Sequence, residues 1–223
     1  LVVDMSSFWG KISAVQPFLS EGQESGLSDA QEPRRVLPKS YQFHNVDACI
    51  MCGACVAACT THEVSKAFLG PAALAKADRF LEDPREPATA KRARLIELEK
   101  EHGIWDCTRC NMCVQVCPKD VQPMEAIIRL RRAALEAGLT STGGARHITG
   151  FVALVRHEGR LNEARMPLTI IAFDWRRLLS VIPLGLKMCW RGKMPNPFAQ
   201  PIPGIAQIRA FFSAGKRPSS SSS

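Results

Sequence analysis

Apolar residues recur three and four positions apart through most of this chain, which is the period of an amphipathic helix. Pro71 and Pro123 each stand where such a pattern begins, and proline is well tolerated in the first turn of a helix. The predicted helices cover residues 70–83, 88–102, 122–138, 145–157 and 204–214. Outside residues 1–3, no useful length of the chain alternates apolar and polar residues, so we predict a mainly α fold.

Some of these helices carry predictions about single residues. His102 shares the apolar side of the helix over residues 88–102, and Gly103 is placed to act as its C-terminal cap. The helix over residues 122–138 has an inward face made of Ile127, Leu130, Ala134 and Leu135. The helix over residues 145–157 has a predicted buried face made of Ile148, Phe151, Val152 and Val155.

Residues 166–190 are apolar but do not have the pattern of a membrane span. Their longest uncharged run is the nine residues 178–186, which Pro183 interrupts. A transmembrane helix needs about 20 apolar residues. Five residues of this segment form an apolar stripe, namely Trp175, Leu178, Leu179, Ile182 and Leu186. Arg176, Arg177 and Lys187 flank it. Such a stripe is typical either of ordinary packing or of a helix that docks on an interface or a partner.

The net charge of +8 is unevenly distributed. Residues 1–125 carry 14 Lys/Arg and 17 Asp/Glu, whereas residues 126–223 carry 15 and 4. The first part is therefore not expected to bind polyanions, and the second is a candidate for contact with an anionic surface or an acidic partner. No segment has the pattern of an RNA- or DNA-binding module, so nucleic acid is not an expected partner. The first residues also lack the pattern of a signal peptide.

Nine cysteines indicate the class of protein. Eight form two blocks with the spacing C-x2-C-x2-C-x3-C, namely Cys49, Cys52, Cys55, Cys59 and Cys107, Cys110, Cys113, Cys117. Cysteines three residues apart cannot easily all find partners at disulfide geometry, whereas thiolates are preferred ligands of soft metals. Cys189 stands alone in an apolar stretch and is predicted to be a small buried residue.

The spacing within each block predicts three ligands for one iron–sulfur cluster and a fourth ligand for the other cluster. Three cysteines at i, i+3 and i+6 can reach three corners of one cluster, and the following turn carries the fourth cysteine away. We therefore assign Cys49, Cys52, Cys55 and Cys117 to one 4Fe-4S cluster, and Cys59, Cys107, Cys110 and Cys113 to the second. Two structural zinc sites are the alternative, although zinc usually uses separated C-x2-C pairs.

The spacer between the two blocks, residues 60–106, contains 47 residues and reads as two helices. This length disfavours a small βαβ-type ferredoxin. The predicted architecture is an α-helical ferredoxin domain that holds two clusters and is followed by a basic helical extension.

Residues 1–137 resemble the C-terminal part of the iron–sulfur (B) subunit of succinate dehydrogenase and fumarate reductase. The resemblance is carried by residues 1–5, 8–9, 17–19, 49–55, 68–74 and 107–123. Residues 145–215 look like the tail of a less usual branch of these subunits. The resemblance implies an electron-transfer subunit with no substrate catalysis of its own. It would pass electrons from an FAD-containing flavoprotein subunit, which oxidises succinate, to a quinone at a membrane anchor subunit.

The pattern and the resemblance together divide the chain. Residues 1–40 are expected to be a connector and linker, at the end of a missing N-terminal 2Fe-2S domain. Residues 41–139 are the helical ferredoxin domain, 140–215 the basic extension and 216–223 a disordered tail. A 2Fe-2S cluster is expected only if a preceding domain exists or another chain supplies it. The implied location is peripheral, on the cytoplasmic face of the inner membrane, with membrane contact mainly through the anchor.

Several positions depart from the pattern of these subunits. Thr60 stands where the family usually has proline, residues 62–65 replace a Trp-rich stretch, and Thr108 stands where a histidine is usual. These positions help form the common quinone pocket, so the resemblance does not extend to a standard ubiquinone site. Cys110 stands where an apolar residue usually leaves a 3Fe-4S cluster, so a full 4Fe-4S cluster is predicted; the alternative is a 3Fe-4S cluster beside a spare thiol.

Two other functions remain open from the sequence. One is an electron-carrying subunit of a heterodisulfide-reductase-like or anaerobic glycerol-3-phosphate-dehydrogenase-like complex, which would use similar cysteine blocks with a different electron donor. The other, of a different class, is a zinc-stabilised nucleic-acid-binding module.

Overall fold

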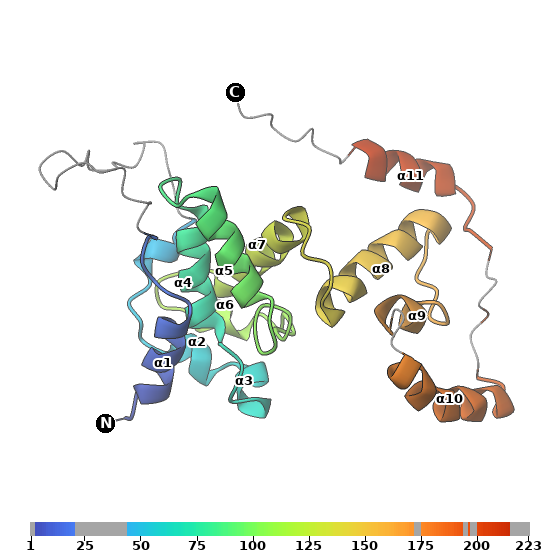
Figure 1. Cartoon of the computed structure of the whole chain (residues 1–223), viewed down its shortest axis with the longest axis horizontal. Helices are drawn as coiled ribbons and strands as arrows, with labels where there is room; N and C mark the ends of the chain where they lie inside the picture. The colour runs from blue at the N-terminus through green and yellow to red at the C-terminus, as the bar shows by residue number, and fades with distance from the viewer. Residues whose placement is uncertain (1–2, 21–43, 172–174, 194–195, 197–199, 215–223) are drawn as a thin grey trace, which may run out of the picture. The chain divides into compact units, whose positions relative to one another are not determined.

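The structure is a computed structural model that describes residues 3–20, 44–171, 175–193, 196 and 200–214 (Figure 1). Within these residues the regular structure is helical and no strand occurs, which confirms the predicted mainly α fold. The chain forms two compact units, unit 1 (Leu1–Leu139) and unit 2 (Thr140–Ser223). The predicted linker from residue 21 onward and the predicted tail over residues 216–223 lie outside the described residues.

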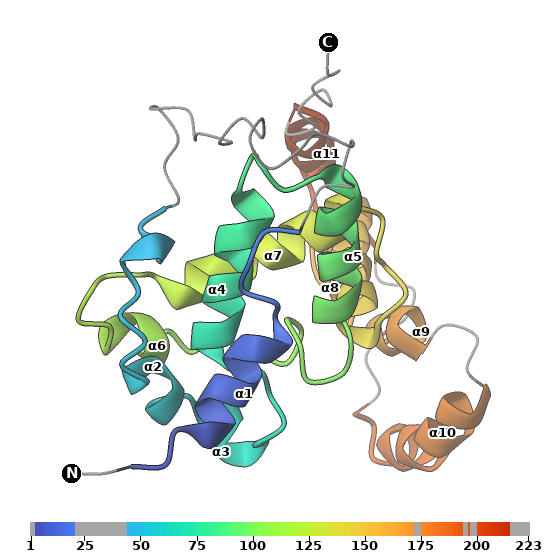
Figure 2. The same ribbon diagram turned by 60° about the vertical axis from the view of Figure 1, so that its left-hand side comes forward.

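Unit 1 is built on helices α4 (Pro71–Glu82) and α7 (Pro123–Glu136), which pack against each other. Both begin at a proline, as predicted, because a first-turn residue needs no helical partner for its N–H. Helices α1 (Ser6–Ala14) and α5 (Ala88–Leu98) pack beside them (Figure 2). The fully buried side chains of this core include Phe68, Leu74, Ala77, Ile127, Leu130 and Ala134.

Helix α1 is absent from the sequence predictions, which treated this region as connector. Ile12, on this helix, and Val15, just after it, are buried in the core of unit 1. The Lys11 ammonium group donates hydrogen bonds to the carbonyl oxygens of Lys66 (2.5 Å) and Phe68 (2.8 Å). Helix α1 is therefore part of the domain that carries the first cysteine block.

The Arg94 side chain holds the chain beyond α1 against α5. Its guanidinium group donates hydrogen bonds to the carbonyl oxygens of Val15 (2.7 Å), Gln16 (2.7 Å) and Phe18 (3.1 Å) and to the Glu86 carboxylate (3.0 Å). This buried arginine thus satisfies three main-chain acceptors and forms one ion pair, which is how a charged group becomes tolerable inside a protein.

The predicted end of α5 is wrong by about one turn. The helix ends at Leu98, so His102 lies beyond it, and Glu99 rather than Gly103 occupies the C-cap position. Gly103 is needed for another reason: a Cβ atom there would overlap the Leu98 carbonyl oxygen, to which the neighbouring N–H of Ile104 donates a hydrogen bond (2.9 Å). A close approach of two backbone segments, and not helix capping, therefore requires glycine at this position.

The cysteine blocks form short helical segments that are too short to show a periodic pattern in the sequence. These segments are η1 (Val46–Ala48), α2 (Ala54–Ala57), α3 (Thr60–Val64) and α6 (Met112–Gln115). Helix α2 contacts both α4 and α6, and α6 contacts α7. The packing of α4 on α7 therefore brings the two blocks together.

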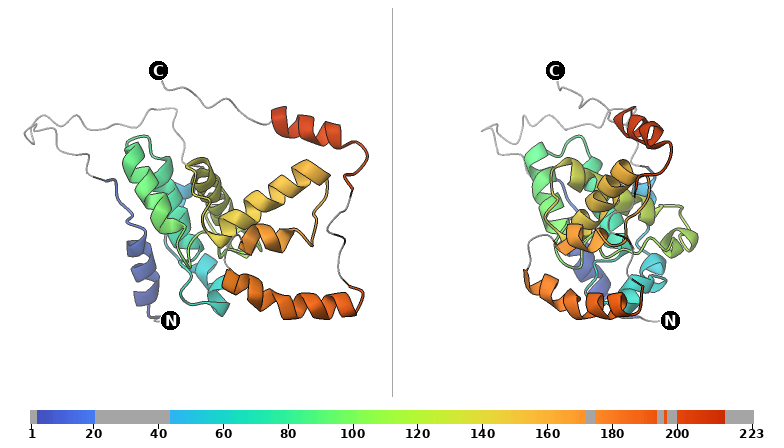
Figure 3. Two further views of the ribbon diagram at one scale, coloured as in Figure 1. Left: turned by 45° about the vertical axis from the view of Figure 1, so that its right-hand side comes forward. Right: turned by 90° about the vertical axis from the view of Figure 1, so that its right-hand side faces the viewer.

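Unit 2 contains α8 (Gly143–Glu158), α9 (Met166–Ile171), α10 (Trp175–Trp190) and α11 (Ile205–Ala214). Helix α8 packs against α9 and α11 (Figure 3). None of the helices in the described residues is both long enough and apolar enough to cross a membrane. The sequence predicted the ranges of α8 and α11 to within two residues at each end.

The predicted buried face of α8 is wrong at two of its four positions, since Ile148 and Val155 are partly buried. Ala145, Gly150, Leu154 and Glu158 are its buried residues, whereas Phe151 and Val152 are exposed. Gly150 lies against the Thr169 side chain of α9, where even a Cβ atom would be too close. The absence of a side chain at Gly150, rather than the larger apolar stripe, therefore decides which face of α8 meets its neighbour.

Candidate iron–sulfur sites

The first cysteine block forms a curled loop between η1 and α2. Met51 (φ 56°) and Gly53 (φ 77°) adopt the left-handed backbone conformation, on either side of Cys52. Glycine accepts this conformation without steric cost, whereas it is uncommon for a residue such as methionine. The two left-handed residues turn the chain so that three cysteines border one hollow.

The second block repeats this conformation residue for residue. Arg109 (φ 56°) and Asn111 (φ 67°) are left-handed at the positions equivalent to Met51 and Gly53. In each block a four-residue helix follows, and then the fourth cysteine, whose N–H donates a 3.2 Å hydrogen bond to the carbonyl three residues earlier. Equal cysteine spacing has therefore produced equal backbone geometry in two segments that are far apart in the chain.

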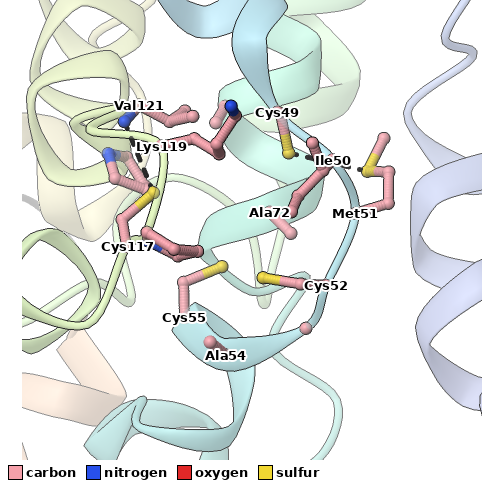
Figure 4. A pocket seen from close by; sticks show the side chains of 14 residues that line it. Cys49, Ile50, Met51, Cys52, Ala54, Cys55, Ala72, Cys117, Lys119 and Val121 are labelled. Atoms are coloured by element: carbon pink, nitrogen blue, oxygen red, sulfur yellow. Dashed lines mark hydrogen bonds between the residues drawn. The ribbon is translucent and has the colours of Figure 1, made fainter.

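The first hollow combines cysteines from both blocks (Figure 4). It is lined by Cys49, Cys52 and Cys55 of the first block and by Cys117 of the second. The other lining residues are mainly apolar and include Ile50, Ala72, Ala75, Val121 and Pro123. Among the described residues that line it, Lys119 is the one cation.

The second hollow has the reverse composition. It is lined by Cys107, Cys110 and Cys113 of the second block and by Cys59 of the first. Phe68, Pro71, Met124 and Ile127 are among its apolar residues, and Arg109 is the one cation among its described lining residues. The structure thus groups the eight cysteines in the two sets of four that the spacing predicted.

The chemistry of the lining residues fits a thiolate-bound cluster. No Asp, Glu or His lines either hollow in the part of the chain that the structure describes, so thiols are the strongest metal-binding groups available there. Within the same described residues, no three His, Cys, Asp or Glu side chains are arranged to hold a single metal ion. The four thiols border a space instead of converging on one point.

Two thiols, one at each hollow, resist ionisation when no cation is present. Burial, with smaller contributions from the neighbouring thiols, raises the pKa of Cys55 to about 12 and that of Cys113 to about 11. A thiol becomes a thiolate when it binds a metal, so cation binding at these sites releases protons. The hollows are therefore poor sites for free thiolates and suitable sites for thiolates that bind iron.

Several donors are directed at the cysteine sulfur atoms. Backbone N–H groups of His62, Arg109 and Val121 donate to the sulfur atoms of Cys59, Cys107 and Cys117, each at 3.4 Å. The Thr60 hydroxyl donates to Cys110 at 3.6 Å. The Met112 backbone N–H and this hydroxyl lower the pKa of Cys110. Hydrogen bonds to sulfur are one of the means by which a protein sets the potential of a cluster.

Arg131 supports the second hollow, although it is not among the site residues that the sequence predicted. It is buried on α7 and donates hydrogen bonds to the carbonyl oxygens of Ile104 (2.7 Å), Trp105 (3.2 Å) and Cys107 (2.7 Å). It lies four residues after Ile127 and four before Leu135, which places it on the predicted inward face of this helix. An arginine at an inward position was the signal that could have identified it.

Cys189 contradicts its prediction. It is exposed on α10, not buried, because no element among the described residues covers that part of the helix. It lies in unit 2, outside both cysteine hollows.

Comparison with known proteins identifies the domain that contains both blocks. Residues 45–121 match the family described as "4Fe-4S dicluster domain". The chain is 36% identical over 130 residues to the fumarate reductase iron–sulfur subunit of Escherichia coli O157:H7. This match covers 57% of this chain and 50% of the relative. It is 29% identical over 140 residues to the succinate dehydrogenase iron–sulfur subunit of Coxiella burnetii, covering 61% and 56%.

A longer match reaches into unit 2. The 8-methylmenaquinol:fumarate reductase iron–sulfur subunit of Wolinella succinogenes is 33% identical over 184 residues, covering 76% of this chain and 52% of the relative. Unit 1 holds 139 of the 223 residues, a smaller share than 76%, so part of unit 2 is included in this match. The chain spans about half the length of the curated relatives that it matches.

These comparisons confirm the resemblance and the predicted helical ferredoxin domain. They do not support the alternative functions, which were a heterodisulfide-reductase-like complex, an anaerobic glycerol-3-phosphate-dehydrogenase-like complex and a zinc-stabilised nucleic-acid-binding module.

Proposed function

We propose that this chain is the electron-transfer iron–sulfur subunit of a succinate:quinone oxidoreductase or fumarate reductase, because residues 45–121 match the 4Fe-4S dicluster family. The observation that carries the proposal is the pair of cysteine hollows, each completed by a cysteine from the opposite block. The named relatives, which are iron–sulfur subunits of fumarate reductases and succinate dehydrogenases, support the choice of complex.

We assign the ligands as the spacing predicted. Cys49, Cys52, Cys55 and Cys117 would hold one 4Fe-4S cluster, and Cys59, Cys107, Cys110 and Cys113 the other. When bound, such clusters supply one-electron redox chemistry. The protein's own task is then to hold the cysteines apart at fixed positions and to exclude bulk water with apolar side chains.

Charged and hydrogen-bonding groups would set the electron affinity at each site. Lys119 and Arg109 each place one cation beside a set of four thiolates, which offsets part of their negative charge. The Thr60 hydroxyl, bonded to Cys110, stands where the related subunits usually have proline. The surroundings of the second site therefore differ from those in the common family members, and we do not expect its electrons to pass to a standard ubiquinone site.

The partners follow from the same proposal. Electrons would enter from an FAD-containing flavoprotein subunit and leave to a membrane anchor subunit with a quinone site. The chain itself would catalyse no reaction of succinate or fumarate. Its proposed location is peripheral, on the cytoplasmic face of the inner membrane. Any 2Fe-2S cluster would belong to a preceding domain or to another chain.

The exchange of the fourth ligands can be tested with four variants of the full chain, Cys49→Ser, Cys59→Ser, Cys107→Ser and Cys117→Ser. Paramagnetic resonance of the reduced proteins, purified without oxygen, identifies which cluster each change perturbs. We expect Cys59→Ser to resemble Cys107→Ser, and Cys117→Ser to resemble Cys49→Ser, because each pair shares a hollow. If Cys59→Ser resembles Cys49→Ser instead, each block binds its own cluster and the assignment is wrong.

The nature of the second cluster depends on Cys110. Two 4Fe-4S clusters require about eight irons per chain, whereas one 4Fe-4S cluster and one 3Fe-4S cluster beside a spare thiol require about seven. Replacing Cys110 with valine should remove one iron and produce the signal that an oxidised three-iron cluster gives. Exposed Cys189, replaced in the same way, is the matched control and should leave the iron count unchanged. An unchanged count in Cys110→Val would show that Cys110 is not a ligand.

The function in a complex requires the intact assembly. Purification of the tagged full chain from native membranes should bring with it a flavin-containing subunit, and succinate should reduce the clusters of that preparation. A preparation that contains both clusters, yet lacks a flavoprotein or does not respond to succinate, would contradict the proposed complex while leaving the cluster assignment intact.

A further inference from the structure

Helix α10 has an apolar face that nothing in the described part of unit 2 covers. Leu179, Ile182, Leu186 and Trp190 follow one another at helical spacing and share one side of the helix. Their exposed fractions are 54%, 46%, 66% and 91%. For comparison, Leu74 in the core of unit 1 is completely buried. Trp175 and Leu178 belong to the same predicted stripe, but their side chains lie outside the described residues.

This exposure decides between the two interpretations that the sequence left open. Ordinary packing within the domain would bury Leu179, Ile182 and Leu186, and the structure leaves all three accessible. Contiguous exposed apolar surface of this kind marks a site of interaction with a protein or a membrane.

The charge of the same segment is entirely positive. Residues 175–200 contain five Lys/Arg and no Asp or Glu. By helical spacing, Arg176 and Lys187 border the apolar face of α10, and Arg191 and Lys193 follow directly after the helix. A helix with tryptophan and leucine on one face and basic residues beside it is typical of helices that lie in a membrane interface.

We propose that α10 lies flat in the surface of an anionic lipid bilayer, with Leu179, Ile182, Leu186 and Trp190 toward the acyl chains. A helix of 16 residues is about 24 Å long, which is too short to span the hydrocarbon core but sufficient to lie along the surface. The basic residues around it would then contact lipid phosphates. Charge of one sign along the whole segment favours an anionic lipid surface, because Lys and Arg beside an apolar helix face are attracted to anionic headgroups.

This inference goes beyond electron transfer and can be tested without a redox partner. The full chain, purified without oxygen, is floated with vesicles of phosphatidylcholine alone or of phosphatidylcholine mixed with phosphatidylglycerol. We expect binding to the mixed vesicles that weakens at high salt, since surface attraction is screened by ions. Replacing Lys187 with glutamine should lower the partition coefficient about fivefold.

Two leucines of the same helix provide a matched pair of variants. Leu186 lies on the proposed lipid-facing side, and Leu184, similarly accessible with an exposed fraction of 59%, lies on the opposite side. Leu186→Glu should reduce vesicle binding at least about tenfold, because a charge would enter the apolar layer. Leu184→Glu should change it by less than about twofold. Trp190→Ser, at the end of the helix, gives a second variant of the lipid-facing side. Iron content and circular dichroism confirm that each variant is folded.

Three outcomes would overturn the proposal. Equal losses in Leu184→Glu and Leu186→Glu would show that the face is wrongly assigned. Unchanged binding in Leu186→Glu and Trp190→Ser would place membrane contact elsewhere. Binding to native membranes without any binding to lipid vesicles would mean that α10 docks on a protein. None of these outcomes bears on the proposed electron transfer, which the cluster variants test separately.

Discussion

Units 1 and 2 are both helical, but they place their apolar residues in opposite ways. In unit 1 the apolar faces of α4 and α7 meet, and Leu74, Ala77 and Leu130 have no exposed surface. In unit 2 the apolar face of α10 remains open to solvent. An amphipathic pattern predicts that one side of a helix will be covered, but it does not say whether protein or another phase will cover it.

The two units also differ in charge: unit 1 is nearly neutral, whereas unit 2 is strongly basic. Unit 1 contains 17 Lys/Arg and 18 Asp/Glu, and its buried arginines donate to internal acceptors, as Arg94 does to three carbonyl groups and Glu86. Unit 2 contains 12 Lys/Arg and 3 Asp/Glu. Unit 1 is therefore organised around an internal site, whereas unit 2 presents its apolar and basic residues outward.

Removal of iron should give the largest difference between the two units, because only unit 1 carries the proposed ligands. The proposed ligands tie together segments that are distant in the chain, so binding of the metal supplies part of the folding energy of unit 1. We expect a chelator to accelerate hydrogen exchange throughout α4 and α7 while exchange in α8 stays unchanged, as measured by mass spectrometry of fragments. A chelator already saturated with iron is the control. Persistent slow exchange in α4 after iron loss would show that the core does not depend on the clusters.

Matched leucine substitutions measure the difference in burial directly. Leu74→Ala removes a completely buried side chain and should lower the free energy of unfolding by about 3 kcal/mol. Leu184→Ala, at an exposed position of α10, should change it by less than about 0.5 kcal/mol. Urea unfolding followed by circular dichroism gives both values. Comparable losses in the two variants would mean that unit 2 buries Leu184 in solution.

A smaller effect is expected from the buried arginine beside the second hollow. Arg131→Met leaves the carbonyl groups of Ile104, Trp105 and Cys107 without their donor, but it also removes a buried charge. We expect a net loss of about 2 kcal/mol in the free energy of unfolding. Its exposed neighbour, replaced as Arg132→Met, is the control and should have almost no effect. If both variants unfold alike, Arg131 does not support the site.

Much of the candidate site could be predicted because its chemistry is local. The spacing of each block indicated three converging cysteines and one that leaves the loop, and the structure repeats the same left-handed turns in both blocks. Pro71 and Pro123 likewise indicated where α4 and α7 begin, since proline restricts its own backbone.

The failures share a different origin, because each depends on how the folded chain surrounds the residue and not on the spacing of apolar residues along a helix. The buried face of α8 follows from the close approach of Thr169 to Gly150. Gly103 is required by the Leu98 carbonyl oxygen, and Cys189 is exposed because no described element covers it. Arg131 supports the second hollow only through the main chain that passes beside it.

The sequence by itself therefore determined the class of chemistry, the helical frame and the division of the charge, because cysteine spacing, proline and composition act within a few residues. Only the tertiary structure decided how Cys117 reaches the first block and Cys59 the second, since the packing of α4 on α7 brings the blocks together. It also decided that the apolar face of α10 is left open. Contacts between distant segments depend on how whole surfaces fit, and this fit is not written in local spacing.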